Sequence, residues 1–160
     1  MKACVLYGPK DLRIEERPVS EPKPGFVRLR MGGVGICGSD LHYYHIGRVG
    51  NAVVREPMIL GHELSGVVDA IGPGVSGLVP GQKVIINPTD ECGTCGYCRS
   101  GHQNLCPDLR YYGSAARTPH VQGIMVEYPM VQARQCVAVS DAMPLDQAAC
   151  VEPLAIALHA

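Results

Sequence analysis

Four cysteines lie close together in the middle of the chain, and their spacing is that of a metal site. They are Cys92, Cys95, Cys98 and Cys106, separated by two, two and seven residues. Thiolates this close in sequence can surround one tetrahedral Zn²⁺ ion. We therefore predict a structural zinc site. A site closed by four protein ligands leaves no open position for a substrate, so chemistry must occur elsewhere.

Two other arrangements of these cysteines remain open. Two disulfide bonds would need an oxidising compartment. The first residues, MKACVLYGPK, contain no apolar run behind a basic start, so we expect no secretory signal and a cytoplasmic location. No long uncharged apolar stretch is present that could cross a membrane. An iron–sulfur cluster is the lesser alternative, because its usual cysteine runs have other spacings.

A second set of potential ligands is spread along the chain. Cys37 stands in GICGSDLHYYH, His62 and Glu63 in LGHELSG, and Glu152 in CVEPLAIALHA. Each has an ordinary alternative explanation. A buried cysteine is more often a small core residue than a ligand. An acid in the first turn of a helix can face the helix dipole, and a histidine beside a glutamate is commonly a surface pair.

Composition restricts the fold and the partners. A chain of 160 residues can bury the core of one domain. Its formal net charge of −1 gives no indication of nucleic acid or an anionic membrane as a partner. Glycine and proline together make up a fifth of the chain, which favours a turn-rich β structure over a helical bundle.

The elements that must position these residues are short. Runs rich in β-branched residues, ended by Gly, Pro or Asp, predict strands. Ser39 or Asp40 can cap an early helical turn, and Asp146 can cap a turn over residues 147–150. Pro153 suits the first turn of a last helix. The predicted strands cover residues 3–7, 12–16, 26–31, 64–71, 83–87 and 135–139.

Taken together, these motifs resemble the catalytic half of zinc-dependent medium-chain dehydrogenases over essentially all 160 residues. The resemblance implies a mainly β fold: a GroES-like, partly open β-barrel with short helices and a zinc-binding lobe. That domain would cover residues 1–152, with the structural zinc lobe at 90–108. Residues 153–160 would begin the connecting helix toward a nucleotide-binding domain. The matching positions are Cys37, Gly61, His62, Glu63, Gly66 and Gly72, followed by the four cysteines.

The sequence is most similar to the polyol branch of that family, the dehydrogenases of sorbitol and L-idonate. Glu152 in its Glu-Pro-Leu context carries this distinction, because classical alcohol dehydrogenases usually have a cysteine at that ligand position. The run GRVG at residues 47–50 is also similar to the polyol branch. The resemblance implies an enzyme that oxidises a secondary alcohol of a polyol or sugar acid, with NAD or NADP as hydride acceptor.

The resemblance also implies two zinc ions per chain, the structural one and a catalytic one. Cys37 and His62 would be direct ligands of the catalytic zinc. Glu63 and Glu152 would supply carboxylates, directly or through a bound water. The metal would lower the pKa of a bound hydroxyl group, and the nicotinamide would accept the hydride.

Four neighbouring residues receive roles from the same resemblance. Ser39 would contact the alcohol and pass its proton toward His42. Asp40 would orient the metal-bound histidine from outside the ligand set, and Tyr43 would contact the substrate. Their ordinary alternatives are a helix cap for Ser39, a surface position for His42 and core packing for Tyr43.

No Gly-x-Gly-x-x-Gly fingerprint follows a strand in these 160 residues. We therefore expect the nucleotide-binding Rossmann domain to be absent, with no cofactor-binding residues in this chain and no turnover by the piece alone. The full-length parent would be a homo-oligomer acting on a small-molecule polyol or aldonate. The alternative is a freestanding zinc-stabilised binding module without catalysis. Cys4, Cys136 and Cys150 have no role in either interpretation and are expected to be buried thiols.

Overall fold

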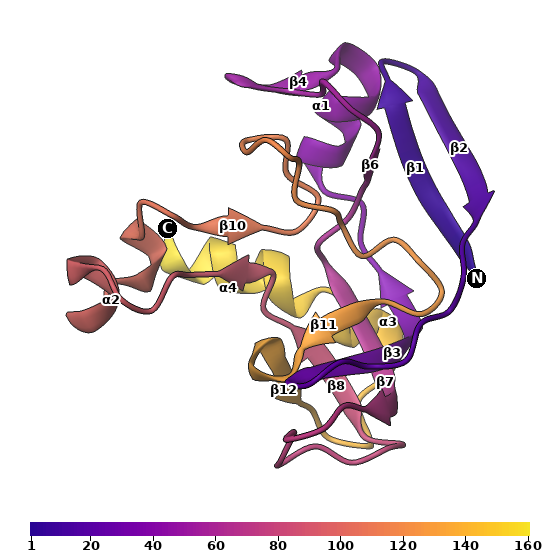
Figure 1. Ribbon diagram of the computed structural model, residues 1–160, viewed down its shortest axis with the longest axis vertical. Helices are drawn as coiled ribbons and strands as arrows, with labels where there is room; N and C mark the ends of the chain where they lie inside the picture. Colours follow the sequence, from indigo (N-terminus) through magenta and orange to yellow (C-terminus); the bar gives the residue numbers. More distant parts are fainter.

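The computed structural model describes all 160 residues and confirms a mainly β fold with short helices (Figure 1). Its centre is a curled five-stranded antiparallel sheet in the order β11–β3–β7–β8–β12. The two long strands, β3 (Phe26–Val34) and β7 (Leu64–Ile71), lie side by side in the middle. The shorter strands are β8 (Lys83–Ile86), β11 (Met130–Gln132) and β12 (Cys136–Ala138).

A second, three-stranded sheet has the order β2–β1–β6. It contains β1 (Lys2–Gly8), β2 (Asp11–Glu16) and β6 (Met58–Ile59). Helix α1 (Gly38–Ile46) lies beside β1 and is followed by a small hairpin of β4 (Arg48–Val49) and β5 (Ala52–Val53). This part and the five-stranded sheet form the upper and lower halves of the molecule in Figure 1.

Apolar and charged side chains alternate along β3, which explains why one face of the five-stranded sheet is buried. Val27 and Leu29 are fully buried. Arg28 points the other way, where its guanidinium contacts the Asp69 carboxylate on β7 at 2.6 Å. Because successive side chains of a strand face opposite sides, this pattern places the apolar positions together in the core. The main core cluster contains Val27, Leu29, Leu64, Val68, Leu78, Val84, Ile86, Ile124 and Val131.

Close approach of β3 and β7 requires a glycine at position 66. A Cβ atom there would lie 2.7 Å from the carbonyl oxygen of Arg30 on the neighbouring strand. Such a contact is closer than packed atoms tolerate, so any side chain would push the two strands apart. Gly66 is therefore needed by the fold, independently of any chemistry.

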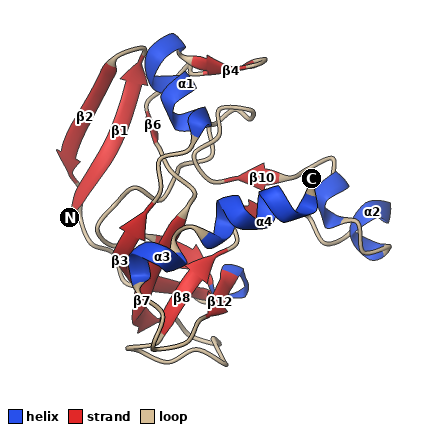
Figure 2. Ribbon diagram, turned by 180° about the vertical axis from the view of Figure 1, so that it is seen from behind, coloured by secondary structure: helices blue, strands red, loops and turns tan.

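The two helices near the end of the chain are α3 (Leu145–Ala148) and α4 (Val151–His159). Figure 2 shows α3 against β3 and β7, and α4 leading away from the sheet toward the four-cysteine lobe. Ser65 ties α3 to the sheet, because its hydroxyl donates to the carbonyl oxygen of Leu145 at 2.5 Å. Pro153 lies in the first turn of α4, as predicted.

The predicted helix caps were wrong. Cys37 is the N-cap of α1, and Asp40 is the third helical residue, whose carboxylate accepts the Cys37 N–H. Pro144, not Asp146, precedes the first residue of α3. In both cases the predicted cap lies inside the first turn, where an acid is also favourable beside the helix N-terminus.

The predicted strand at 135–139 is shorter in the structure. Gln135 ends a 3₁₀ turn, η2 (Ala133–Gln135), and only Cys136–Ala138 pairs with β8. The Gln135 amide is buried and bonded at both ends: its oxygen accepts the Tyr112 hydroxyl, and its nitrogen donates to the Thr89 carbonyl. Both polar atoms of this buried amide are therefore paired, as buried polar groups require.

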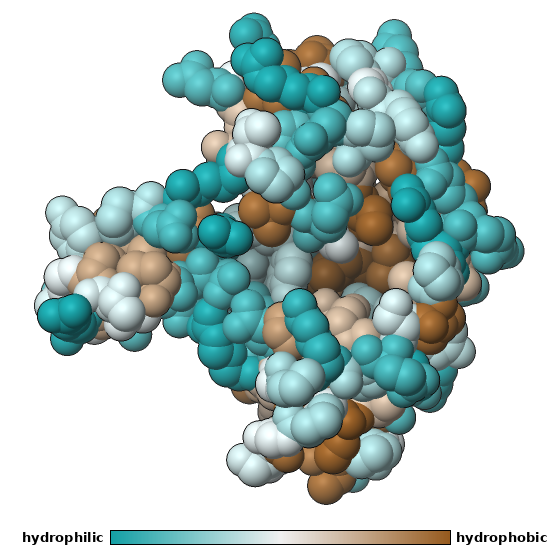
Figure 3. All heavy atoms as spheres, in the orientation of Figure 1, coloured by the Kyte–Doolittle hydropathy of each residue, from teal (hydrophilic) through white to brown (hydrophobic).

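The four-cysteine lobe, residues 90–108, projects from the main body (Figure 3). Its stem is a two-stranded ribbon of β9 (Thr89–Asp90) and β10 (Arg110–Tyr111). The lobe contains α2 (Gly96–Arg99) and the 3₁₀ turn η1 (Gln103–Leu105). Arg134 of η2 forms ion pairs with Asp90 and Glu91, which anchors the stem to the sheet. None of the helices in the molecule has the length and apolar character needed to cross a membrane.

Candidate metal and substrate site

Cys37 lies close to His62 and Glu63 in the structure, although it comes from a different segment of the chain. One ligand atom of each lies within 4.8 Å of the others. Cys37 stands at the start of α1, whereas His62 and Glu63 directly precede β7. His62 and Glu63 are buried. The fold therefore brings together a thiol, an imidazole and a carboxyl group that are up to 26 residues apart.

These residues fit a zinc ion. The Nδ1 atom of His62 is buried and has no hydrogen-bond partner in the chain. An unpaired buried nitrogen is costly in a folded protein, and a cation held by the cluster would satisfy the imidazole. One sulfur, one nitrogen and one oxygen donor are typical zinc ligands, and three protein ligands leave a position open.

Two glycines make room for the cluster. Gly61 has a φ of +91°, and a Cβ there would clash with the Met125 side chain. Only glycine adopts this backbone conformation readily, so Gly61 sets the turn that presents His62. A Cβ on Gly35 would overlap the Glu63 carboxylate. The backbone N–H of Gly35 also donates to the Glu63 carbonyl at 2.8 Å.

Asp40 supports the site through the backbone. One oxygen of its buried carboxylate accepts the Cys37 N–H at 3.0 Å, and the other accepts the Gly61 N–H at 3.1 Å. The carboxylate makes no hydrogen bond to the His62 ring. Asp40 thus holds together the two segments that supply the ligands, whereas the resemblance implied a contact with the histidine itself.

The ligand cluster lines a cavity of about 360 Å³. Ser39 and Tyr43 reach it from α1, and Glu152 reaches it from α4. The Tyr43 hydroxyl accepts the Ala115 N–H at 3.1 Å, and its ring packs in a core cluster. Its contact with the substrate stays a prediction. The other lining residues are Val49, Tyr111, Tyr112, Gly113, Ser114, Pro153 and Ile156.

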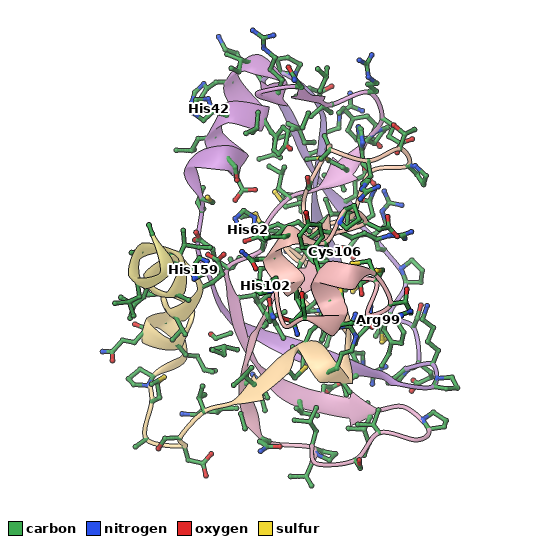
Figure 4. The ribbon with its side chains drawn as sticks, turned by 90° about the vertical axis from the view of Figure 1, so that its left-hand side faces the viewer. His42, His62, Arg99, His102, Cys106 and His159 are labelled. Carbon is green, nitrogen blue, oxygen red and sulfur yellow. The ribbon has the colours of Figure 1, made fainter.

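His42 is not brought to this cavity. It is exposed and lines a separate hollow with Ile46 and Arg48. Figure 4 shows His42 on α1, apart from His62. No hydrogen bond joins Ser39 to His42. The proton path between them stays a prediction.

Glu152 lies near the cluster but outside the group of three. Its Oε1 accepts the Tyr111 hydroxyl at 2.5 Å. The Tyr111 ring meets the His62 ring edge to face, with centroids 5.1 Å apart. Burial raises the pKa of Tyr111, and the hydrogen bond to Glu152 raises it further, so the phenol stays a proton donor at neutral pH.

Charge is concentrated at this cavity. Burial raises the pKa of Glu63; His62 opposes the rise, and the neighbouring Glu152 carboxylate adds to it. Two carboxylates that repel one another are stabilised by a cation between or beside them. The electrostatics of the cavity therefore agree with a metal ion beside Cys37, His62 and Glu63.

The four cysteines of the lobe form the cluster that their spacing predicted, with all four sulfur atoms within 4.8 Å. The Cys92 and Cys98 sulfurs are 4.0 Å apart, and those of Cys95 and Cys98 are 3.5 Å apart. A tetrahedron with Zn–S bonds of about 2.3 Å has sulfurs about 3.8 Å apart. A disulfide would need about 2.05 Å, so the lobe has the geometry of a zinc site.

None of the three remaining cysteines is fully buried. Cys4 and Cys136 are half-buried, whereas Cys150 is exposed, which corrects the expectation for that residue. It is the residue that precedes α4.

Sequence reasoning missed the roles of Gly35 and Tyr111. Gly35 lies in the glycine-rich run GGVGICGSD, a signal of close backbone approach that could have been used. Tyr111 had no comparable signal, because its contact with Glu152 spans 41 residues and depends on the lobe's stem.

Comparison with known proteins gives one consistent result. The alcohol dehydrogenase GroES-like domain matches residues 23–141. Sorbitol dehydrogenase of Gallus gallus is 42% identical over 158 residues, which are 99% of this chain and 43% of that protein. L-idonate 5-dehydrogenase (NAD(P)(+)) of Escherichia coli is 43% identical over 160 residues, covering 99% of this chain and 46% of that protein.

Solved structures agree. The crystal structure of L-idonate 5-dehydrogenase from Escherichia coli has a TM-score of 0.93 and 41% identity, covering 99% of this chain and 45% of that chain. The crystal structure of galactitol-1-phosphate dehydrogenase from Escherichia coli has a TM-score of 0.88 and 33% identity. The match covers 99% of this chain and 44% of that chain. This chain thus spans less than half the length of the relatives that it matches. The chain belongs to the alcohol dehydrogenase GroES-like domain family, within the zinc-dependent medium-chain dehydrogenases.

Proposed function

We propose that this chain is the catalytic domain of a zinc-dependent, NAD- or NADP-linked dehydrogenase that oxidises a secondary alcohol of a polyol or sugar acid. One observation carries the proposal: Cys37, His62 and Glu63 converge within 4.8 Å on a cavity of about 360 Å³. Sorbitol and L-idonate dehydrogenases among the relatives support the substrate class.

In this proposal each residue has a defined task. Cys37, His62 and Glu63 hold the ion, and Ser39 accepts a hydrogen bond from the substrate hydroxyl inside the cavity. Glu152 faces the same cavity from α4. When bound, zinc supplies a Lewis acid that stabilises negative charge on the alcohol oxygen. The hydride acceptor, NAD or NADP, would bind to a part of the parent protein beyond these residues.

Metal stoichiometry tests the proposal against its alternative, a zinc-stabilised binding module without catalysis. We expect two zinc ions per purified chain. Cys37→Ser with His62→Ala should remove one, and Cys92→Ser with Cys98→Ser should remove the other. A wild-type chain that holds only one zinc, lost with the lobe cysteines, would support the module instead.

Substrate approach can be tested without the nucleotide-binding part. Co²⁺ in the Cys37 site has visible absorption bands that report its ligand number and geometry. Sorbitol and L-idonate should each be added to the Co²⁺-loaded chain. The control is the same buffer without either compound. A saturable change in those bands supports a polyol or aldonate substrate. Bands that neither compound alters would contradict the proposed substrate class.

A further inference from the structure

Tyr111 connects three features of the cavity. Its hydroxyl donates to Glu152 at 2.5 Å, its ring packs edge to face on His62, and the residue lines the cavity itself. No sequence motif assigns it a role. A hydrogen bond from a neutral phenol to a carboxylate is charge-assisted and stronger than one between neutral groups.

The position of Tyr111 is fixed by the two-stranded ribbon of β9 and β10 and by the contacts of the next residue. It belongs to β10, where it pairs with Thr89 on β9. The next residue, Tyr112, donates its N–H to the Pro88 carbonyl and its hydroxyl to the buried Gln135. The ribbon therefore holds the phenol of Tyr111 at a defined place, whereas Glu152 lies on a helix whose other residues are largely exposed.

We propose that Tyr111 is a positioning residue that keeps the Glu152 carboxylate out of the Cys37–His62–Glu63 ligand set. This inference rests on the proposed function. A free carboxylate beside a zinc ion is itself a good ligand and would close the open position. The phenol holds Oε1, and Oε2 makes no hydrogen bond within the chain. Oε2 is then available to the molecule that occupies the open position.

The test uses the 160-residue chain and compares Tyr111→Phe with Tyr112→Phe. One equivalent of Zn²⁺ first fills the four-thiolate site, and Co²⁺ is then titrated into the second site. In Tyr111→Phe, Glu152 should enter the Co²⁺ shell, so its visible bands should shift and weaken as the ligand number rises. The Co²⁺ affinity should rise, because a carboxylate joins the three ligands that the wild-type chain supplies.

The control removes the hydroxyl of the adjacent tyrosine, which bonds to Gln135 instead of Glu152, so Tyr112→Phe should keep the wild-type bands. Adding Glu152→Gln to Tyr111→Phe should restore them, because an amide is a poor zinc ligand. Phenylalanine preserves the ring and the strand, and thermal unfolding checks that both variants fold.

The outcomes separate the two proposals. If wild-type chain shows no Co²⁺ bands that depend on Cys37, the proposed metal site is wrong and the role of Tyr111 is wrong with it. If wild-type bands are present but Tyr111→Phe leaves them unchanged, or if Glu152→Gln does not reverse the change, only the role of Tyr111 is refuted.

Discussion

The space beside Gly35 decides where the Glu63 carboxylate lies. Glycine there leaves room for the acid, whereas any Cβ would overlap it. The same logic applies at Gly61, whose positive φ presents His62. The candidate ligand set therefore depends on two glycines as well as on the ligands themselves.

We predict that Gly35→Ala weakens metal binding at the Cys37 site. The new methyl group must displace the Glu63 carboxylate, so Co²⁺ affinity should fall by about tenfold or more. Competition titration against a chelator measures this. Gly38→Ala is the matched control, because nothing lies within 4 Å of a Cβ at that position. Equal affinities in the two variants would contradict the steric argument.

Thiol reactivity should separate the cysteines outside the metal sites. Burial raises the pKa of Cys136 to about 12, so its reactive thiolate is scarce at pH 7. Cys150 is exposed. In the zinc-loaded chain, iodoacetamide should alkylate Cys150 well before Cys136, as peptide mass mapping would show. Faster labelling at Cys136 would mean that its surroundings open in solution.

Helix α1 depends on an acid that also holds the metal segments together. Asp40 accepts the N–H groups of Cys37 and Gly61. We predict that Asp40→Ala lowers the free energy of unfolding by about 2 kcal/mol, because it removes the carboxylate that accepts the Cys37 N–H at the helix start and leaves the buried Gly61 N–H unpaired. Urea denaturation measures the loss. The exposed ion pair of Asp11 offers a control, since Asp11→Ala should leave the transition unchanged.

The four-cysteine lobe should be the least stable element without metal. It has one buried cysteine, Cys106, and few apolar contacts, so zinc must supply most of its folding energy. We predict that a chelator, or Cys98→Ser, speeds trypsin cleavage after the exposed Arg99 while the sheet stays intact. Cys150→Ser should not change the cleavage rate. If the lobe without zinc resists trypsin as well as the zinc-loaded lobe does, its backbone hydrogen bonds are sufficient to keep it folded.

At the scale of the whole molecule, α4 presents apolar side chains that nothing covers. Leu154 is 55% exposed and Leu158 is 80% exposed. Beside them, α4 and β8 form a hollow of about 280 Å³ lined largely by apolar residues. Exposed apolar patches of this kind promote association.

We predict that the 160-residue chain self-associates as its concentration rises. Leu154→Glu with Leu158→Glu should shift the sedimentation profile toward monomer, because charges oppose burial of this helix. Leu12→Glu, on the exposed face of β2, is the control and should leave the profile unchanged. A wild-type chain that stays monomeric at all concentrations would contradict this.

The sequence predicted the features that depend on local spacing. The spacing of Cys92, Cys95, Cys98 and Cys106 is typical of a zinc site formed within one short segment, so their cluster was predictable. Strand β7 was also predicted at its observed bounds, because it is a run with β-branched residues that ends at a glycine, Gly72. The helix caps were mistaken because the observed N-cap residues, Cys37 and Pro144, are not among the residue types that favour that position.

By itself, the sequence determined a mainly β chain with a four-cysteine lobe and the types of the candidate ligands. Only the tertiary structure decided that Asp40 bonds two backbone segments, that His42 faces a different hollow, and that Tyr111 holds Glu152. The physical reason is distance along the chain. Residue types and short spacings are local properties, whereas a hydrogen bond across 41 residues exists only once the β9–β10 ribbon and α4 have packed together.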